Sequence, residues 1–190
     1  MSRHRAAGPA VRRRREGPAN TRLVVLVFLL AAAVVVVDQV TKVIATATLS
    51  EDVARPFLGD FITLQLVFNP GAAFSFASGM TWIFTVVAAV VVTVVVRMSH
   101  RIDSGWWAVM LGLLLGGATG NLIDRLVREP GFGRGHVVDF LNYGGWFIGN
   151  LADIAIVAAA VGIAVLALVG LELDGTRAGA VRDTDETADA

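Results

Sequence analysis

Hydrophobic residues dominate four long stretches of this chain. They cover about residues 23–45, which begin LVVLVFLLAAAVVVV, and about residues 80–97, 105–125 and 147–171. A helix needs about 20 mostly apolar residues to cross the hydrocarbon core of a bilayer, and each stretch reaches or approaches that length. The pattern predicts an all-α membrane protein with four transmembrane helices, which together form one compact domain, residues 23–171.

Charge is distributed unevenly along the chain although the formal net charge is zero. Residues 1–22 carry seven Arg and one Glu, the turn 98–104 is basic together with the adjacent Arg97, and the charged residues of 172–190 are mostly acidic. Because short basic flanks stay in the cytoplasm, we expect both termini inside and segments 46–79 and 126–146 outside. The basic tail is then a topology determinant that contacts anionic lipids rather than nucleic acid, and the acidic tail is predicted to be disordered.

The first apolar stretch allows a second interpretation. An Arg-rich start before an apolar run is typical of a cleavable signal peptide, and Ala45-Thr46-Ala47 resembles a cleavage site. Three further spans follow, however, and the run is at the long limit for such a segment. We therefore interpret it as a retained helix. The chain has no cysteine, which excludes disulfides and thiol chemistry.

Polar residues in or beside these spans gather at one depth. They lie at the outer ends of the first, third and fourth spans and in the connection before the fourth. The group comprises Asp38, Lys42, Asn121, Asp124, Arg125, Asp139, Asn150 and Asp153. Asp38 and Lys42 share a helix face at i and i+4 and are expected to pair. Because carboxylates near hydrocarbon are costly, this convergence predicts an active site or an ion site near the outer membrane face.

Asp139 and Asp153 are the candidate reactive pair. Gly144 and Gly145 interrupt any helix between them, so that one carboxylate can approach from a loop and the other from a helix. Two close carboxylates in a poorly solvated pocket do not ionise together, which yields a base for water and an acid for a carbonyl. The residues alone also allow ion or proton handling, or a structural role in which Asp153 caps the last helix. His136 stands nearby, but without a ligand cluster we expect no metal.

Two further patterns are structural. In residues 57–76, the run TLQLVF has the alternation of a half-buried strand and is followed by the turn signal Asn69-Pro70-Gly71. We expect a small extracytoplasmic β element between the first and second spans that presents this turn to the site. In the third span, Gly112, Gly116 and Gly120 recur every fourth residue, a spacing that permits close helix contact.

Five motifs occur in order along the chain: DQVTK (38–42), NPGAAF (69–74), GGATGNLIDR (116–125), GHVVDF (135–140) and NLAD (150–153). This series resembles the bacterial lipoprotein signal peptidases, also called signal peptidase II, over about residues 23–170. Each motif is weak alone, but their order and predicted side make the combination specific. The resemblance implies a membrane aspartyl endopeptidase that removes signal peptides from diacylglyceryl-modified prolipoproteins, cutting just before the lipidated cysteine, without metal or other cofactor.

Residue by residue, the resemblance implies that Asp139 and Asp153 are the catalytic pair. It implies substrate-binding or supporting roles for Asp38, Lys42, Asn69, Gly71, Asn121, Asp124, Arg125, Asn150 and Ala152. The implied partners are prolipoproteins with a diacylglyceryl cysteine and membrane lipids. The implied location is the bacterial cytoplasmic membrane, with the active site near its outer face.

Three features depart from the family pattern. Gly149 stands where phenylalanine is usual, and Ile154 where a small hydroxyl residue is usual. We expect that Trp146 and Phe147 already supply the missing aromatic bulk. The loop 126–134, LVREPGFGR, is longer and richer in Gly and Pro than a minimal loop, and we expect it to alter substrate gating.

The competing class of function is a small ion- or proton-coupled membrane carrier subunit that uses the same carboxylates. Such a carrier predicts polar groups through the full depth of the membrane, and the inner halves of these spans lack them. A presenilin-like protease is a third possibility, but its Tyr-Asp and Gly-x-Gly-Asp signatures are missing.

Overall fold

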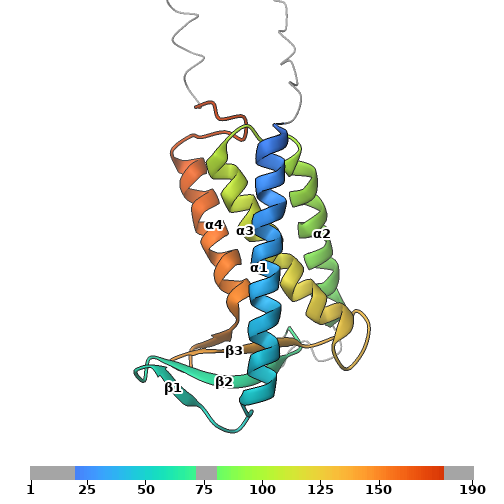
Figure 1. The fold of residues 1–190 in the computed structure, drawn as a ribbon, viewed down its shortest axis with the longest axis vertical. Helices are drawn as coiled ribbons and strands as arrows, with labels where there is room; N and C mark the ends of the chain where they lie inside the picture. The colour runs from blue at the N-terminus through green and yellow to red at the C-terminus, as the bar shows by residue number, and fades with distance from the viewer. Residues whose placement is uncertain (1–19, 72–80, 178–190) are drawn as a thin grey trace, which may run out of the picture.

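Four helices and a small sheet make up the computed structural model, which describes residues 20–71 and 81–177 (Figure 1). The helices are α1 Thr21–Thr48, α2 Thr81–Ser99, α3 Gly105–Val127 and α4 Leu151–Leu168. Each is long and apolar enough to span a bilayer, which confirms the predicted multi-pass membrane protein. The predictions for the basic tail up to residue 19, the acidic tail from residue 178 and residues 72–76 of the β element lie outside the described residues.

Helix α3 is the centre of the bundle. Half of its span is buried, against 17% of each other span, and it packs against α1, α2 and α4. Its glycines permit this packing: a Cβ on Gly116 would lie 2.6 Å from Cβ of Val34 on α1, and one on Gly117 would lie 2.5 Å from the Ala152 carbonyl oxygen on α4. The close contact predicted from the glycine spacing is therefore confirmed.

The sheet crosses one end of the bundle and is antiparallel throughout, in the order β1-β2-β3-β4 (Figure 1). Strands β1 Arg55–Leu58 and β2 Ile62–Asn69 form the predicted β element between the first two spans. Strands β3 Val137–Tyr143 and β4 Phe147–Gly149 were not predicted. Asp139 therefore comes from a strand rather than a loop, and the fourth helix begins at Leu151 rather than residue 147.

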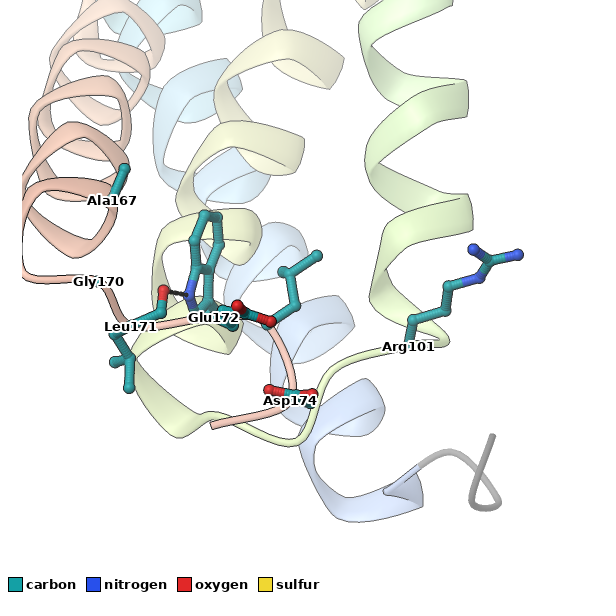
Figure 2. A pocket seen from close by; sticks show the side chains of 8 residues that line it. Arg101, Ala167, Gly170, Leu171, Glu172 and Asp174 are labelled. Atoms are coloured by element: carbon teal, nitrogen blue, oxygen red, sulfur yellow. Dashed lines mark hydrogen bonds between the residues drawn. The ribbon is translucent and has the colours of Figure 1, made fainter. Parts of the chain in front are cut away.

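The opposite end of the bundle is closed by the segment after α4. Trp107 Nε1 donates a hydrogen bond to the Leu171 carbonyl oxygen at 2.9 Å, as drawn in Figure 2, and the Asp103 amide donates to the Leu173 carbonyl oxygen at 2.9 Å. Residues 172–177, assigned by composition to a disordered tail, instead turn back so that Arg177 pairs with Leu171. A pocket of about 500 Å³ lies here, remote from the predicted polar cluster.

Candidate active site

Helices α1, α3 and α4 reach the sheet at one end of the bundle (Figure 1), and the predicted polar residues on these elements contact one another there. Buried side chains at this end include Asp38, Lys42, Asn121, Asp124, Asp139 and Asn150. Hydrogen bonds and ion pairs join all of them, together with Asn69 and Asp153, into one network. The expectation that the polar groups converge from three helices and the intervening connection is thus correct.

Asp139 is held from both sides in β3. Asp139 is only 2% exposed to solvent. Oδ2 accepts a hydrogen bond from Asn69 Nδ2 at 2.8 Å, and Oδ1 accepts one from Asn150 Nδ2 at 2.7 Å. Asn69 is itself fixed, because its Oδ1 accepts from the Gly71 amide at 2.8 Å. Gly71 has φ +95°, and an added Cβ would lie 2.5 Å from the Phe84 ring, so this turn requires glycine.

Asp153 lies in the first turn of α4 and interacts electrostatically with Asp139. It forms a capping box with Asn150: the Asp153 amide donates to Asn150 Oδ1 at 3.0 Å, and the Asn150 amide donates to Asp153 Oδ2 at 3.1 Å. The capping role considered for Asp153 is therefore real. Its second oxygen remains available to the site, where Oδ1 accepts from Asn121 Nδ2 at 2.8 Å.

Two asparagines bridge the carboxylates. Asn150 Nδ2 reaches both Asp139 Oδ1 and, at 3.3 Å, Asn121 Oδ1. Asn121 in turn donates to Asp153. The path Asp139–Asn150–Asn121–Asp153 is continuous, and each amide has its oxygen and nitrogen committed to different partners. Because the amides cannot flip without losing bonds, they fix the orientation of both carboxylates.

Lys42 of α1 donates a hydrogen bond to Asn121 in this path and also pairs with two further carboxylates. Its ammonium lies 2.9 Å from Asp38 Oδ2, 2.8 Å from Asp124 Oδ2 and 3.0 Å from Asn121 Oδ1, so that all three of its protons have acceptors. The expected pairing with Asp38 is present, and Asp124 is an additional partner. Asp38 Oδ1 also accepts from the Ala152 amide at 3.1 Å, which ties α1 to the first turn of α4.

The surroundings of Asp139 disfavour the ionised form of its carboxyl group. Burial raises the pKa of Asp139 to about 6, and the charge of Asp153 acts in the same direction, against hydrogen bonds from Asn69 and Asn150 and the charge of Lys42. One of two neighbouring carboxyl groups thus keeps its proton to higher pH than an ordinary aspartate does, which is the asymmetry that a carboxyl pair acting on a carbonyl uses.

A sequence model of the Peptidase A8 family, described as signal peptidase (SPase) II, matches residues 30–169. The chain belongs to the signal peptidase II family. It is 51% identical over 154 residues to the lipoprotein signal peptidase of Rhodococcus jostii (strain RHA1), covering 81% of this chain and 78% of that protein. It is 47% identical over 160 residues to that of Mycolicibacterium smegmatis, covering 84% and 68%.

Two solved structures of bacterial membrane enzymes have a similar fold. A bacterial membrane enzyme determined at 2.3 Å resolution superposes with a TM-score of 0.66 at 27% identity, over 80% of this chain and 92% of that one. A second, at 1.9 Å resolution, gives a TM-score of 0.67 at 26% identity, over 80% and 97%.

Two residues of the network were missed in the sequence. Gln39 Nε2 lies 3.1 Å from Asp38 Oδ2, 3.2 Å from Asp124 Oδ1 and 3.2 Å from the Gly120 carbonyl oxygen. Arg128 Nε donates to Asp124 Oδ1 at 2.7 Å. Arg128 follows Asp124 by four residues, a helical ion-pair spacing that could have indicated it. Gln39 stands next to Asp38 in the DQVTK motif and had no comparable signal.

Arg125 is placed differently from the other predicted residues. Its guanidinium lies over the Phe84 ring of α2, 5.9 Å from the centroid, and interacts electrostatically with Asp139 and Asp153. Its Nη1 donates to the Asn121 carbonyl oxygen at 3.3 Å. Nε is buried and has no hydrogen-bond partner within residues 20–71 and 81–177. This donor beside the carboxylates is suited to an incoming acceptor.

The departures from the family pattern leave the carboxyl pair intact. At Gly149 an added Cβ would lie 2.6 Å from the Phe147 ring and 2.9 Å from Asp153 Oδ2, so Phe147 fills the space beside this glycine. Trp146 is 95% exposed and does not contribute. Ile154 is 45% exposed and lines an apolar groove between α1, α3 and α4, facing away from the carboxylates.

The loop 126–134 is attached to α2, because Thr85 Oγ1 donates to the Gly133 carbonyl oxygen at 2.8 Å. Its expected effect on substrate gating stays a prediction. Within the part of the chain that the structure describes, no group of three or more His, Cys, Asp or Glu side chains could hold a metal ion.

Proposed function

We propose that this chain is an aspartyl endopeptidase that removes signal peptides from diacylglyceryl-modified prolipoproteins, cutting just before the lipidated cysteine. The observation that carries the proposal is the bridged pair of carboxylates, Asp139 from β3 and Asp153 from α4, joined through Asn150 and Asn121. Membership of the signal peptidase II family and relatives named lipoprotein signal peptidase support the substrate class.

The two carboxyl groups take different roles in this mechanism. Asp139 carries the proton, because burial disfavours its charge. Asp153 lies in the first turn of α4, where the helix dipole favours a negative charge, and accepts a proton from water as the water oxygen attacks the scissile carbonyl. The Asp139 proton hydrogen-bonds the developing oxyanion. When the intermediate collapses, the C–N bond breaks and the proton on Asp153 passes to the leaving amine.

Substrate contacts follow from the remaining donors and from the membrane. We assign the buried Nε of Arg125 to a backbone carbonyl of the substrate near the cleavage site. The acyl chains of the substrate lie in the bilayer. The basic residues before α1, together with Arg97 and Arg101 around the turn after α2, favour an orientation with both termini in the cytoplasm. In this orientation the sheet and its carboxylates lie at the outer face of the cytoplasmic membrane.

The test is cleavage of a lipidated and an unlipidated precursor by purified protein. Wild type should cleave only the lipidated form and should remain active in EDTA. Asp139→Asn and Asp153→Asn should each lose activity by orders of magnitude while membrane insertion is unchanged. Asp60→Asn, in the exposed turn between β1 and β2, is the matched control and should keep wild-type activity. Turnover by either dyad variant near the level of the control would remove that residue from the mechanism.

A further inference from the structure

The buried charges under the active site balance only when a fourth residue is counted. Asp38, Lys42 and Asp124 are fully buried, and the Lys42 ammonium is shared between the two carboxylates at 2.9 and 2.8 Å. These three side chains alone carry a net charge of −1. Arg128 supplies the second positive charge through a 2.7 Å contact from Nε to Asp124 Oδ1. Its side chain is 22% exposed, so the pair joins the buried cluster to the surface.

Asp124 connects Arg128 to the strand that carries Asp139. Its two oxygens accept four bonds, from Lys42, Gln39, Arg128 and the Val138 amide at 3.2 Å. A carboxylate has about four acceptor positions, so Asp124 is saturated and cannot turn without losing partners. Val138 immediately precedes Asp139 on β3, and it is fully buried.

The second path runs through the shared ammonium. Lys42 donates to Asn121 Oδ1 at 3.0 Å, which leaves Asn121 Nδ2 directed at Asp153 Oδ1 at 2.8 Å. If Arg128 is removed, Asp124 loses one of the two cations that form a direct ion pair with it, while Arg125 still acts on it electrostatically. The Lys42 ammonium is then shared between the buried carboxylates of Asp38 and Asp124 without the second ion pair. An unbalanced buried charge is strongly disfavoured. A shift of Lys42 toward Asp124 would release the amide that orients Asp153.

We propose that Arg128 is a positioning residue of the peptidase, whose positive charge neutralises the Asp38–Lys42–Asp124 cluster and so holds β3 and Asn121 in the geometry that the two aspartates need. This inference rests on the proposed function of Asp139 and Asp153. It concerns a residue outside the five motifs, just after the last residue of α3. The ion-pair partner of Arg128 is Asp124 rather than Asp139 or Asp153.

The charge of Arg128 should be visible in the pH profile of cleavage. The groups that face Asp139 are Asp153 from α4, Lys42 from α1 and Arg125 from α3. A net negative charge left in the cluster makes a nearby carboxyl group hold its proton to higher pH. Since Asp139 acts as the acid, the alkaline limb of the kcat/KM profile should move to higher pH in Arg128→Gln. A purely structural role would lower the yield of folded enzyme without moving this limb.

The experiment compares Arg128→Gln, which keeps a hydrogen-bond donor but no charge, with Arg128→Lys, which keeps the charge. Arg134→Gln is the matched control, because it removes the same charge from an exposed position in the following loop. Arg128→Gln should lower kcat by about tenfold or more at nearly constant KM, the scale on which residues that orient functional ligands act. Arg128→Lys should recover most of the loss, and Arg134→Gln should match wild type.

Each result is decisive. If wild type cleaves and Arg128→Gln behaves like Arg134→Gln, the inference fails and the proposed function stands. If wild type does not cleave the lipidated precursor, the proposed function fails and the inference with it. If Arg128→Gln does not fold, Asp124→Asn/Arg128→Gln removes one charge of each sign and should restore folding. Equal failure of the single and double variants would overturn the role assigned to charge.

Discussion

At the scale of single residues, the two carboxyl groups of the site differ in their surroundings more than in their chemistry. Asp139 is buried in a strand between two amide donors, whereas Asp153 is partly buried at the start of a helix and also caps it. Burial therefore raises the pKa of Asp139, so that this carboxyl group keeps its proton to higher pH than an ordinary aspartate. In the proposed mechanism, this difference in surroundings lets Asp139 act as the acid and Asp153 as the base.

The raised pKa of Asp139 predicts how stability depends on pH. Because the pKa of about 6 in the folded protein exceeds the ordinary value of 3.8, the folded state binds more protons than the unfolded state between these values. The contribution to stability is fully present below pH 3.8 and is lost as pH rises through about 6. A difference of about two pKa units corresponds to about 3 kcal/mol.

Thermal melting in detergent between pH 4 and 7 measures this dependence. The melting temperature of wild type, relative to Asp139→Asn, should fall as pH rises through this window, because the variant has no titrating group at position 139. Extending the measurement to about pH 8 should show the difference level off, because Asp139 is then ionised in both the folded and the unfolded state. Parallel curves for the two proteins across the window would show that Asp139 titrates at its ordinary value.

The sequence located most residues of the site but not the whole network. Asp139, Asp153 and Asn150 could be found because costly polar residues in apolar surroundings are conspicuous and fell in ordered motifs. Gln39 could not, because a glutamine beside an aspartate has no distinctive pattern and its partner Asp124 lies 85 positions away. Contacts between distant residues depend on helix packing, which a single sequence does not specify.

At the scale of elements, β3 and β4 were the main omission. The run VVDFL in β3 is apolar at four of five positions and buried throughout, so it lacks the alternation that indicates a half-buried strand. The β4 strand has only three residues and joins directly to α4, and its apolar residues were therefore included in the fourth span. The capping box at Asn150 marks the true beginning of that helix.

The junction of β4 and α4 provides a test at Gly149. A Cβ at this position would lie 2.6 Å from the Phe147 ring and 2.9 Å from Asp153 Oδ2. Gly149→Ala should therefore lower stability by about 1–3 kcal/mol, as overpacking does, and should also reduce cleavage by displacing Asp153. Gly105→Ala is the control, since no atom lies within 4 Å of its added Cβ.

A second substitution separates the two contacts of Gly149. Removing the ring with Phe147→Ala in the Gly149→Ala background should recover the part of the stability lost to the ring contact. Cleavage should stay low, because the contact with Asp153 remains. The two contacts are separated by melting and turnover of wild type, Gly149→Ala, Phe147→Ala and the double variant. An unchanged Gly149→Ala enzyme would mean that the junction accommodates a methyl group.

At the scale of the whole molecule, the ends of the helix bundle are chemically different. The sheet crosses one end, while α1 begins and α4 ends at the other (Figure 1). The polar cluster lies at the end with the sheet, because it includes Asn69 of β2 and Asp139 of β3. The number of spans could be predicted because apolar length is a property of local sequence. The orientation in the membrane rests on basic residues alone, and it stays a prediction.

The absence of cysteine from the chain makes this orientation directly measurable. Asp52→Cys places a single thiol in the exposed turn between α1 and β1, and His100→Cys places one in the exposed turn between α2 and α3. Because a charged maleimide does not cross the bilayer, intact cells should be labelled at position 52 only, and position 100 should react after permeabilisation. Both variants should keep cleavage activity, since neither residue belongs to the polar cluster. Labelling of position 100 in intact cells, with position 52 protected, would invert the topology and place the carboxylates at the cytoplasmic face.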